Sequence, residues 1–139
     1  MATASASIDI PVSADTIWQL VGGFGSLADW NSGIATAETG EGGRVRHLVT
    51  RDGAVIVERL LRFDEAGRSY TYGIVESPIP QKDYRSTLEV TAIGDNSARV
   101  EWSGQFTADG VGDEVVIGVF QGIYEGGLQS LQDHFTLTA

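Results

Sequence analysis

The sequence contains no cysteine, and it has only three prolines and one methionine among its 139 residues. Without cysteine, the chain can form neither a disulfide nor a thiolate metal site, and it has no cysteine nucleophile. No apolar run reaches the roughly 18 residues that a membrane-spanning helix needs. The first residues also lack the basic and apolar regions of a signal peptide. We therefore expect a cytoplasmic protein that does not insert into a membrane.

Positive charge is also scarce in this chain. Lys82 is the only lysine, and nine basic residues in all oppose nineteen carboxylates, so that the formal net charge is −10. A field of this sign repels the phosphate backbone of nucleic acids. We therefore exclude nucleic-acid binding, whereas the acidity itself is typical of a well-solvated surface and does not indicate a substrate.

The common catalytic and metal-binding motifs are absent as well. The two histidines, His47 and His134, are far apart in the chain and do not form the HExxH spacing of a zinc site. The sequence has no Walker loop, no GxGxxG between a strand and a helix, and no nucleophile elbow. We expect neither a metal nor a cofactor.

Hydrophobic periodicity at the start of the chain predicts a strand and two helices. Alanine and isoleucine alternate with polar residues over residues 3–10, which is typical of a strand with one buried face. Pro11 ends this strand, and Ser13 is placed to cap a helix that begins near Ala14. The segment "FGSLADW" predicts a second short helix, capped by Ser26.

The rest of the chain predicts strands and then one long helix. Six strand-like runs cover residues 34–38, 44–50, 55–63, 68–76, 84–93 and 98–107. The dipeptide Asp52-Gly53 between two of them predicts a hairpin with a type I′ turn. Helical periodicity returns from about Asp113 to Phe135. A curved, seven-stranded antiparallel sheet wrapped around this last helix would bury the apolar faces in one α+β domain spanning residues 1–139.

This order of elements resembles the START/Bet v 1-like (SRPBCC) superfamily, which has the helix-grip fold, and within it the bacterial polyketide cyclase/dehydrase group. The segment "IPVSADTIWQLVGGFGSLADW" resembles the family's opening strand and helices, and "ARVEWSGQF" resembles its last strand. The segment from "GGRVRHLVT" to "PIPQKDY" resembles its central hairpins. The resemblance implies a hydrophobic cavity between the sheet and the C-terminal helix. Different members use it to bind lipids, plant hormones or aromatic polyketides, and some catalyse cyclisation or condensation.

A more distant similarity links the chain to the plant abscisic-acid receptors, through Arg46, the "ERL" at Glu58–Leu60 and the "YRS" at Tyr84–Ser86. The gate loop of those receptors is replaced here by the tight turn at residues 51–53. Their latch histidine and arginine correspond to Ile79 and Pro80. We therefore do not expect this chain to be a hormone receptor.

The resemblance and the helical period of about 100° per residue together select the residues that would line the cavity. The predicted ligand-binding residues are Trp30, Arg46, Leu48, Ile56, Glu58, Leu60, Tyr72, Ile74, Tyr84, Ser86, Val119, Phe120, Ile123, Tyr124 and Gly127. Alternation alone leaves residues 55–63 open, because Val55, Val57, Leu61 and Phe63 form an equally apolar face. It also leaves the direction of Trp102 open.

Three of these residues are candidates for chemistry. If the resemblance holds, Arg46 and Glu58 project from paired strands into the same space, where a charge-assisted pair would offset much of the cost of burial. The pair is then either structural, or it orients the polar end of a ligand. A third possibility is that Glu58 is a general base and Arg46 stabilises an oxyanion. Tyr84 is a candidate hydrogen-bond donor to a ligand carbonyl.

The last helix contains four glycines between residues 118 and 127, and each costs a helix about 1 kcal/mol relative to alanine. Gly127 falls on the face that covers the sheet, so it predicts a space left for a ligand. On this view Gly127→Leu would abolish ligand uptake in a protein that still folds. Gly118 and Gly122 fall on the outer face with Gly126 at its edge. They are either a tolerated weakness or a groove for a partner helix, and a glycine pair can also bend a helix.

The sequence thus leaves three functions open. The first is the binding of a small hydrophobic ligand, such as a lipid, a polyketide or another aromatic molecule, by a monomer or weak homodimer. The alternative is a cyclase or dehydratase that uses Glu58 and Arg46 in the same cavity. A purely structural or partner-binding domain, in contrast, predicts a filled cavity.

Overall fold

A computed structural model describes residues 1–137. Within them, seven strands form one sheet in the order β1-β7-β6-β5-β4-β3-β2. The strands are β1 (Ala2–Ile10), β2 (Ile34–Gly40), β3 (Val45–Thr50), β4 (Val55–Asp64), β5 (Ser69–Glu76), β6 (Gln81–Gly94) and β7 (Ser97–Ala108). The helices are α1 (Ala14–Val21), α2 (Leu27–Trp30) and α3 (Asp113–Leu137), and a short 3-10 turn, η1 (Glu41–Gly43), joins β2 to β3.

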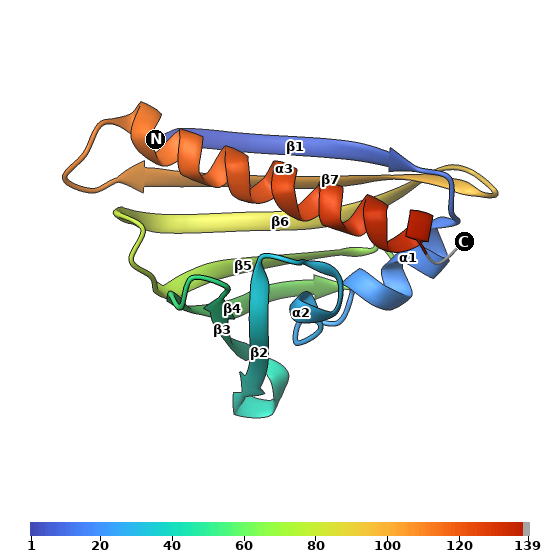
Figure 1. Cartoon of the computed structure of the whole chain (residues 1–139), viewed down its shortest axis with the longest axis horizontal. Helices are drawn as coiled ribbons and strands as arrows, with labels where there is room; N and C mark the ends of the chain where they lie inside the picture. Colours follow the sequence, from blue (N-terminus) through green and yellow to red (C-terminus); the bar gives the residue numbers. More distant parts are fainter. Residues whose placement is uncertain (138–139) are drawn as a thin grey trace.

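Every pair of neighbouring strands is antiparallel. Helix α3 lies lengthwise on one face of the sheet, over β1 and β7, and the short strands β2 and β3 run across the direction of the long strands (Figure 1). The sheet is therefore strongly twisted, and its concave face is covered by α3. The expected order of one strand, two helices, six strands and one helix is confirmed, as is the helix-grip architecture that the resemblance implied.

The first helix forms as its sequence predicts. The side-chain oxygen of Ser13 accepts a hydrogen bond from the backbone N–H of Thr16, which caps α1. Ser26 also precedes a helix, but its side chain makes no capping bond; its backbone carbonyl accepts the N–H of Asp29 instead. The expected side-chain cap at Ser26 is therefore wrong, because a helix of a single turn can be closed by backbone bonds alone.

The hairpin between β3 and β4 forms with a different turn from the one expected. Gly53 has a φ of 90°, but Asp52 does not share a positive φ. The N–H of Thr50 donates to the carbonyl of Ala54 at 2.9 Å, and the N–H of Gly53 donates to the carbonyl of Thr50 at 3.0 Å. The loop thus has three residues with a left-handed glycine at its end, whereas a type I′ turn needs two central residues of positive φ.

The core lies between the concave face of the sheet and the three helices. Alternate residues of β7 point into it, and Trp102, at 2% exposed, belongs to this inward set. On β4 the inward residues include Ile56 and Glu58, whereas Val55 and Leu61 are exposed. The structure thus selects the inward face of β4 that the resemblance implied, and it shows that Trp102 points inward.

Helix α3 is amphipathic and covers the core with a narrow stripe. Val116, Phe120, Tyr124, Leu128 and Leu131 are buried. Phe120 and Tyr124 were expected on this face. Val119 and Ile123 were expected on the buried face, but they lie at its edge and are more than a third exposed. Within residues 1–137, none of the helices combines the length and the hydropathy that crossing a membrane requires.

Candidate functional site

A small cavity of about 40 Å³, which we call the inner cavity, lies between the sheet and α3. Its walls are Leu27, Asn31, Ile34, Leu48, Ile56, Glu58, Tyr72, Ile74, Ile79, Tyr84, Trp102, Phe120 and Ile123. Most of these side chains are apolar, and Glu58 is the only charged residue among them. The inner cavity has room for only a few water molecules.

Two wider grooves share walls with the inner cavity. The outer groove, of about 280 Å³, adds Ser32, Gly33, Thr50, Gly122, Gly126, Gly127 and Ser130 to the shared residues Asn31, Ile34, Ile56 and Ile123. The side groove, of about 430 Å³, lies between α3, the β3–β4 turn and the loop at Pro78 and Ile79. Ile56 and Ile123 border all three spaces. The inner cavity is thus separated from both grooves by a few side chains only.

The structure brings about half of the predicted ligand-binding residues to the wall of the inner cavity. These are Leu48, Ile56, Glu58, Tyr72, Ile74, Tyr84, Phe120 and Ile123. Gly127 lines the outer groove and Val119 the side groove. The buried residues Trp30, Arg46, Ser86 and Tyr124 are not among the wall residues. Leu60 borders a separate surface hollow with Arg44 and residues 61–63.

Five wall residues were not predicted from the sequence. Leu27 and Asn31 lie in and just after the short helix α2, and Ile79 lies in the loop before β6. Loop positions carry no periodicity that would indicate which way they point. Ile34 begins a strand that was predicted, and Trp102 had an undecided direction, so these two residues could have been included on the alternation of their strands.

Arg46 and Glu58 face each other on β3 and β4 and form a buried ion pair. The Nε of Arg46 donates to Oε1 of Glu58 at 2.8 Å, and Nη1 donates to the carbonyl of Phe24 at 3.0 Å and to the hydroxyl of Tyr70 at 3.3 Å. The guanidinium also lies over the rings of Phe24, at 4.2 Å, and Tyr72, at 4.8 Å. Arg46 is 0% exposed, so only Glu58 of the pair reaches the cavity wall.

The charge state of this pair follows from its burial. Burial raises the pKa of Glu58, and the attraction of Arg46 offsets only part of that rise. Burial acts to lower the pKa of Arg46, but the combined effects of Tyr70, Glu58 and Tyr72 outweigh it, so that this pKa is also raised. Arg46 therefore stays charged, while Glu58 takes up a proton more readily than an exposed glutamate. Within residues 1–137 no group of three or more His, Asp or Glu side chains is placed to hold a metal ion.

A row of hydroxyl groups lies beside this pair in the core. The hydroxyls of Tyr72 and Tyr84 are 3.4 Å apart, and those of Tyr84 and Tyr124 are 2.5 Å apart. The Nε1 of Trp102 donates to the Tyr72 hydroxyl at 3.0 Å and to Oγ of Ser86 at 3.1 Å. Burial raises the pKa of all three tyrosines, so their hydroxyls keep their protons at neutral pH. This row can therefore donate hydrogen bonds to an acceptor atom in the cavity.

Gly104 provides the space in which the Tyr124 hydroxyl lies. Gly104 occupies an inward position of β7 between Trp102 and Phe106. A Cβ at this position would overlap the Tyr124 hydroxyl and would lie 3.5 Å from Cε2 of Tyr84. A glycine in a strand interior often marks such a close approach.

The space beside Gly127 is occupied by a neighbouring side chain. A Cβ at this position would lie 2.6 Å from Cζ3 of Trp102 and 3.1 Å from Nδ2 of Asn31. The expectation that Gly127 leaves a space for a ligand is therefore wrong: the glycine lets the helix pack closely on the indole of Trp102. In contrast, a Cβ at Gly118, Gly122 or Gly126 would meet no atom within 4 Å in the described residues, apart from the adjacent residues and the backbone of α3 itself.

Because their surroundings differ, replacing Gly126 or Gly127 by alanine is expected to change the stability of the protein in opposite directions. Gly126→Ala is expected to raise the free energy of unfolding by about 0.5–1 kcal/mol, because it removes the helix penalty of glycine without a clash. Gly127→Ala is expected to lower it by about 1–3 kcal/mol, because the new methyl group displaces Trp102. Urea denaturation of both variants measures the difference. Stabilisation by both substitutions would show that Trp102 does not pack against α3.

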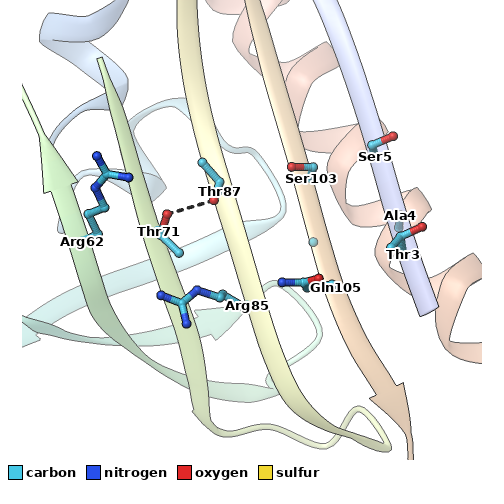
Figure 2. A pocket seen from close by; sticks show the side chains of 10 residues that line it. Thr3, Ala4, Ser5, Arg62, Thr71, Arg85, Thr87, Ser103 and Gln105 are labelled. Carbon is cyan, nitrogen blue, oxygen red and sulfur yellow. Dashed lines mark hydrogen bonds between the residues drawn. The ribbon is translucent and has the colours of Figure 1, made fainter. Parts of the chain in front are cut away.

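A further hollow lies on the outer face of the sheet, away from α3. Figure 2 shows this hollow, which has a volume of about 390 Å³. Arg62 and Arg85 lie in it beside hydroxyl groups from four strands. The hydroxyls of Thr71 and Thr87 are hydrogen-bonded to each other at 2.9 Å. It is a shallow and polar surface, and it lacks the apolar walls that small-molecule sites usually have. The inner cavity and the outer groove are therefore the better candidate site.

Comparisons with known proteins agree with this architecture. The sequence model of the family described as "Polyketide cyclase / dehydrase and lipid transport" matches residues 1–136. The protein XoxI from Bacillus cereus is 46% identical, with a TM-score of 0.95 over 98% of this chain and 96% of that one. An uncharacterised protein from Bacillus thuringiensis is 45% identical, with a TM-score of 0.95 over 97% and 99% of the two chains.

More distant structures share the fold alone. Norcoclaurine synthase from Thalictrum flavum is 17% identical, with a TM-score of 0.77 over 99% of this chain and 87% of that one. A START superfamily protein from Mycobacterium smegmatis is 14% identical, with a TM-score of 0.82 over the full length of both chains. A comparison with curated protein sequences finds no match. Because the family match spans nearly the whole sequence, the chain belongs to the polyketide cyclase/dehydrase and lipid-transport family.

Proposed function

We propose that this protein binds one small apolar or aromatic molecule in the inner cavity and the outer groove. The observation that carries the proposal is that the two spaces adjoin, because Asn31, Ile34, Ile56 and Ile123 form walls of both. Small-molecule sites are mostly apolar and contain a few polar groups that orient the ligand. Here Glu58, Tyr72 and Tyr84 are such groups on an otherwise largely apolar wall.

The volumes indicate how a ligand would be accommodated. The inner cavity alone, at about 40 Å³, is too small for a ring system, whereas the outer groove holds about 280 Å³, close to the roughly 300 Å³ at the lower end of known ligand sites. A ligand would therefore lie mainly in the outer groove and extend its inner end past Ile123. This side chain is 37% exposed on α3, so its rotation can widen the opening without disturbing the core.

Two measurements test this proposal. Native mass spectrometry of gently purified protein is expected to detect a bound hydrophobic molecule. The neutral fluorescent probe N-phenyl-1-naphthylamine is expected to bind to the emptied protein with one saturable site. If this probe does not bind and no molecule co-purifies, the interior is a filled core and the proposal is wrong.

A second candidate function is catalysis by the same site. Glu58 favours it, because this carboxyl group reaches the cavity wall with a raised pKa and lies on the same wall as the hydroxyls of Tyr72 and Tyr84. An ionised Glu58 would take a proton from a carbon beside a carbonyl group, and the electron pair of that C–H bond would move to the carbonyl oxygen. Tyrosine hydroxyls would then stabilise the resulting enolate by hydrogen bonds.

The variant Glu58→Gln separates catalysis from binding. Glutamine keeps the size of the side chain and can still accept a hydrogen bond from Arg46, but it cannot transfer a proton. For an enzyme, turnover of an aromatic β-keto substrate is expected to fall by about 10²–10⁴, with little change in ligand affinity. Unchanged turnover in an active protein would remove Glu58 from the mechanism, and the absence of turnover in the wild type would favour binding alone.

A further inference from the structure

The walls of the inner cavity and the outer groove contain no lysine or arginine. Arg46 lies close by, but it is completely buried, its Nε donates to Glu58, and aromatic rings cover its guanidinium. Its Nη2 has no hydrogen-bond partner among the described residues, but this atom is enclosed in the core and Arg46 does not line either space. The side groove contains Arg51 next to Asp52, and the Nε of Arg51 donates to the carbonyl of Ser32. A ligand carboxylate in the inner cavity would therefore meet Glu58 and no free cation.

The net charge of the protein also disfavours an anionic ligand. With a formal net charge of −10, the protein repels anions at long range. Transfer of a carboxylate into an apolar site is costly unless a cation or several hydrogen bonds compensate it. Fatty acids and other carboxylates are therefore poor ligands for this interior.

The polar groups on the walls are well suited to a carbonyl oxygen. The Tyr72 hydroxyl accepts a hydrogen bond from Trp102, so its own proton is free for another acceptor. The hydroxyl of Tyr84, at 3.4 Å, is a distant acceptor for it. A ligand oxygen that enters the inner cavity can offer a shorter hydrogen bond. Both hydroxyls stay protonated at neutral pH. The Tyr84 hydroxyl can donate to a ligand when Tyr124 is the donor in the hydrogen bond that these two tyrosines share.

A further donor lies where the outer groove meets the inner cavity. Asn31 lines both spaces and is 7% exposed. Its Oδ1 accepts the N–H of Gly33 at 3.0 Å, and its amide NH₂ makes no hydrogen bond to any residue in the described part of the chain. A ligand that passes from the outer groove into the inner cavity thus meets the Asn31 amide and then the two tyrosine hydroxyls.

We infer that the ligand is an uncharged ring compound with a carbonyl oxygen, and that this oxygen is bound by Tyr72 and Tyr84 in the inner cavity. The inference rests on the proposed function, since it concerns the ligand of that same site. The ring system lies in the outer groove, and the carbonyl group is the part that extends inward past Ile123. The protein discriminates against carboxylates because Arg46, the cation beside the site, forms an ion pair with Glu58 and does not line the cavity.

Three probes with the same ring frame test this inference: fluorene, 9-fluorenone and fluorene-9-carboxylate. We expect 9-fluorenone to bind about three- to tenfold more tightly than fluorene, which is the effect of about one net hydrogen bond. The carboxylate should bind at least about tenfold more weakly than fluorene. Quenching of tryptophan fluorescence at pH 7 measures all three affinities, since Trp102 lies on the wall.

Variants then locate the effect. In Tyr72→Phe/Tyr84→Phe the advantage of 9-fluorenone over fluorene should disappear, while the affinity for fluorene stays within about twofold. Thr87→Val, on the outer face of β6, is the matched control and should keep the wild-type preference. The comparison of the three probes in wild-type protein needs no variant, so it remains decisive if the double variant does not fold.

The outcomes distinguish this inference from the proposed function. Equal affinity for fluorene and 9-fluorenone, or tighter binding of the carboxylate, would overturn the inference and leave apolar ligand binding intact. A preference for 9-fluorenone that persists in Tyr72→Phe/Tyr84→Phe would overturn the assignment to these hydroxyls. If none of the probes binds, while N-phenyl-1-naphthylamine does not bind either, both the inference and the proposed function are wrong.

Discussion

Gly104→Ala is expected to lower the free energy of unfolding by about 3 kcal/mol, because it adds a methyl group where the Tyr124 hydroxyl already lies and breaks a buried hydrogen bond. The added Cβ would overlap the Tyr124 hydroxyl and force it away from Tyr84. Urea denaturation monitored by tryptophan fluorescence gives the free energy of unfolding for this variant and for the wild type.

The same substitution should be tolerated once the hydroxyl is removed. In Tyr124→Phe the nearest ring atom to the new Cβ is Cζ, at 3.3 Å, which needs only a small adjustment. In the Tyr124→Phe variant, Gly104→Ala is therefore expected to lower the free energy of unfolding by less than about 1 kcal/mol. A double-mutant cycle would then show a strong coupling between residues 104 and 124. If the effects of the two substitutions simply add, Gly104 does not accommodate the Tyr124 hydroxyl.

Glu58→Leu is expected to be the most damaging change at the buried ion pair, with a loss of about 3–5 kcal/mol, because Arg46 is left without a counter-charge. Glu58→Gln should cost much less, because its amide oxygen can accept the bond from Nε of Arg46. Arg46→Met/Glu58→Leu should recover most of the loss, since both charges are removed. A double variant no more stable than Glu58→Leu would show that Arg46 contributes chiefly through its packing.

The raised pKa of Glu58 also predicts the direction of a pH effect. Its value in the folded protein lies above the ordinary 4.5, so the folded state binds this proton more tightly than the unfolded chain does. The stability that this group contributes is present below about pH 4.5 and is lost as the pH rises through the folded-state pKa. As the pH rises from about 4.5 through the folded-state pKa of Glu58, the free energy of unfolding of the wild type should therefore fall relative to that of Glu58→Gln. Urea denaturation at a series of pH values measures this difference.

The fold could be predicted largely from local patterns. Alternating residues identified the strands, and the Ser13 cap marked the start of the first helix. The type of the turn between β3 and β4 could not be predicted from the sequence. The dipeptide "Asp-Gly" is compatible with more than one loop length, and the backbone beyond the dipeptide decides between them. The three-residue loop after Thr50 is such a case.

The site could be predicted only in part. The pairing of Arg46 with Glu58 was expected from the resemblance, whereas periodicity could not choose between the two apolar faces of β4. A missing side chain at Gly127 does not reveal whether the space is empty or holds a neighbour, because that depends on how closely α3 approaches Trp102. Asn31 and Ile79 were missed because they lie outside periodic segments.

The most direct test of ligand binding in this interior is to block its entrance. Ile123 borders the inner cavity and both grooves, whereas Val115 is exposed on the same helix and borders none of them. We expect Ile123→Trp to weaken the binding of N-phenyl-1-naphthylamine at least about tenfold and Val115→Trp to change it less than about twofold. Equal binding by wild type and Ile123→Trp, with both proteins folded, would contradict a ligand site between the sheet and α3.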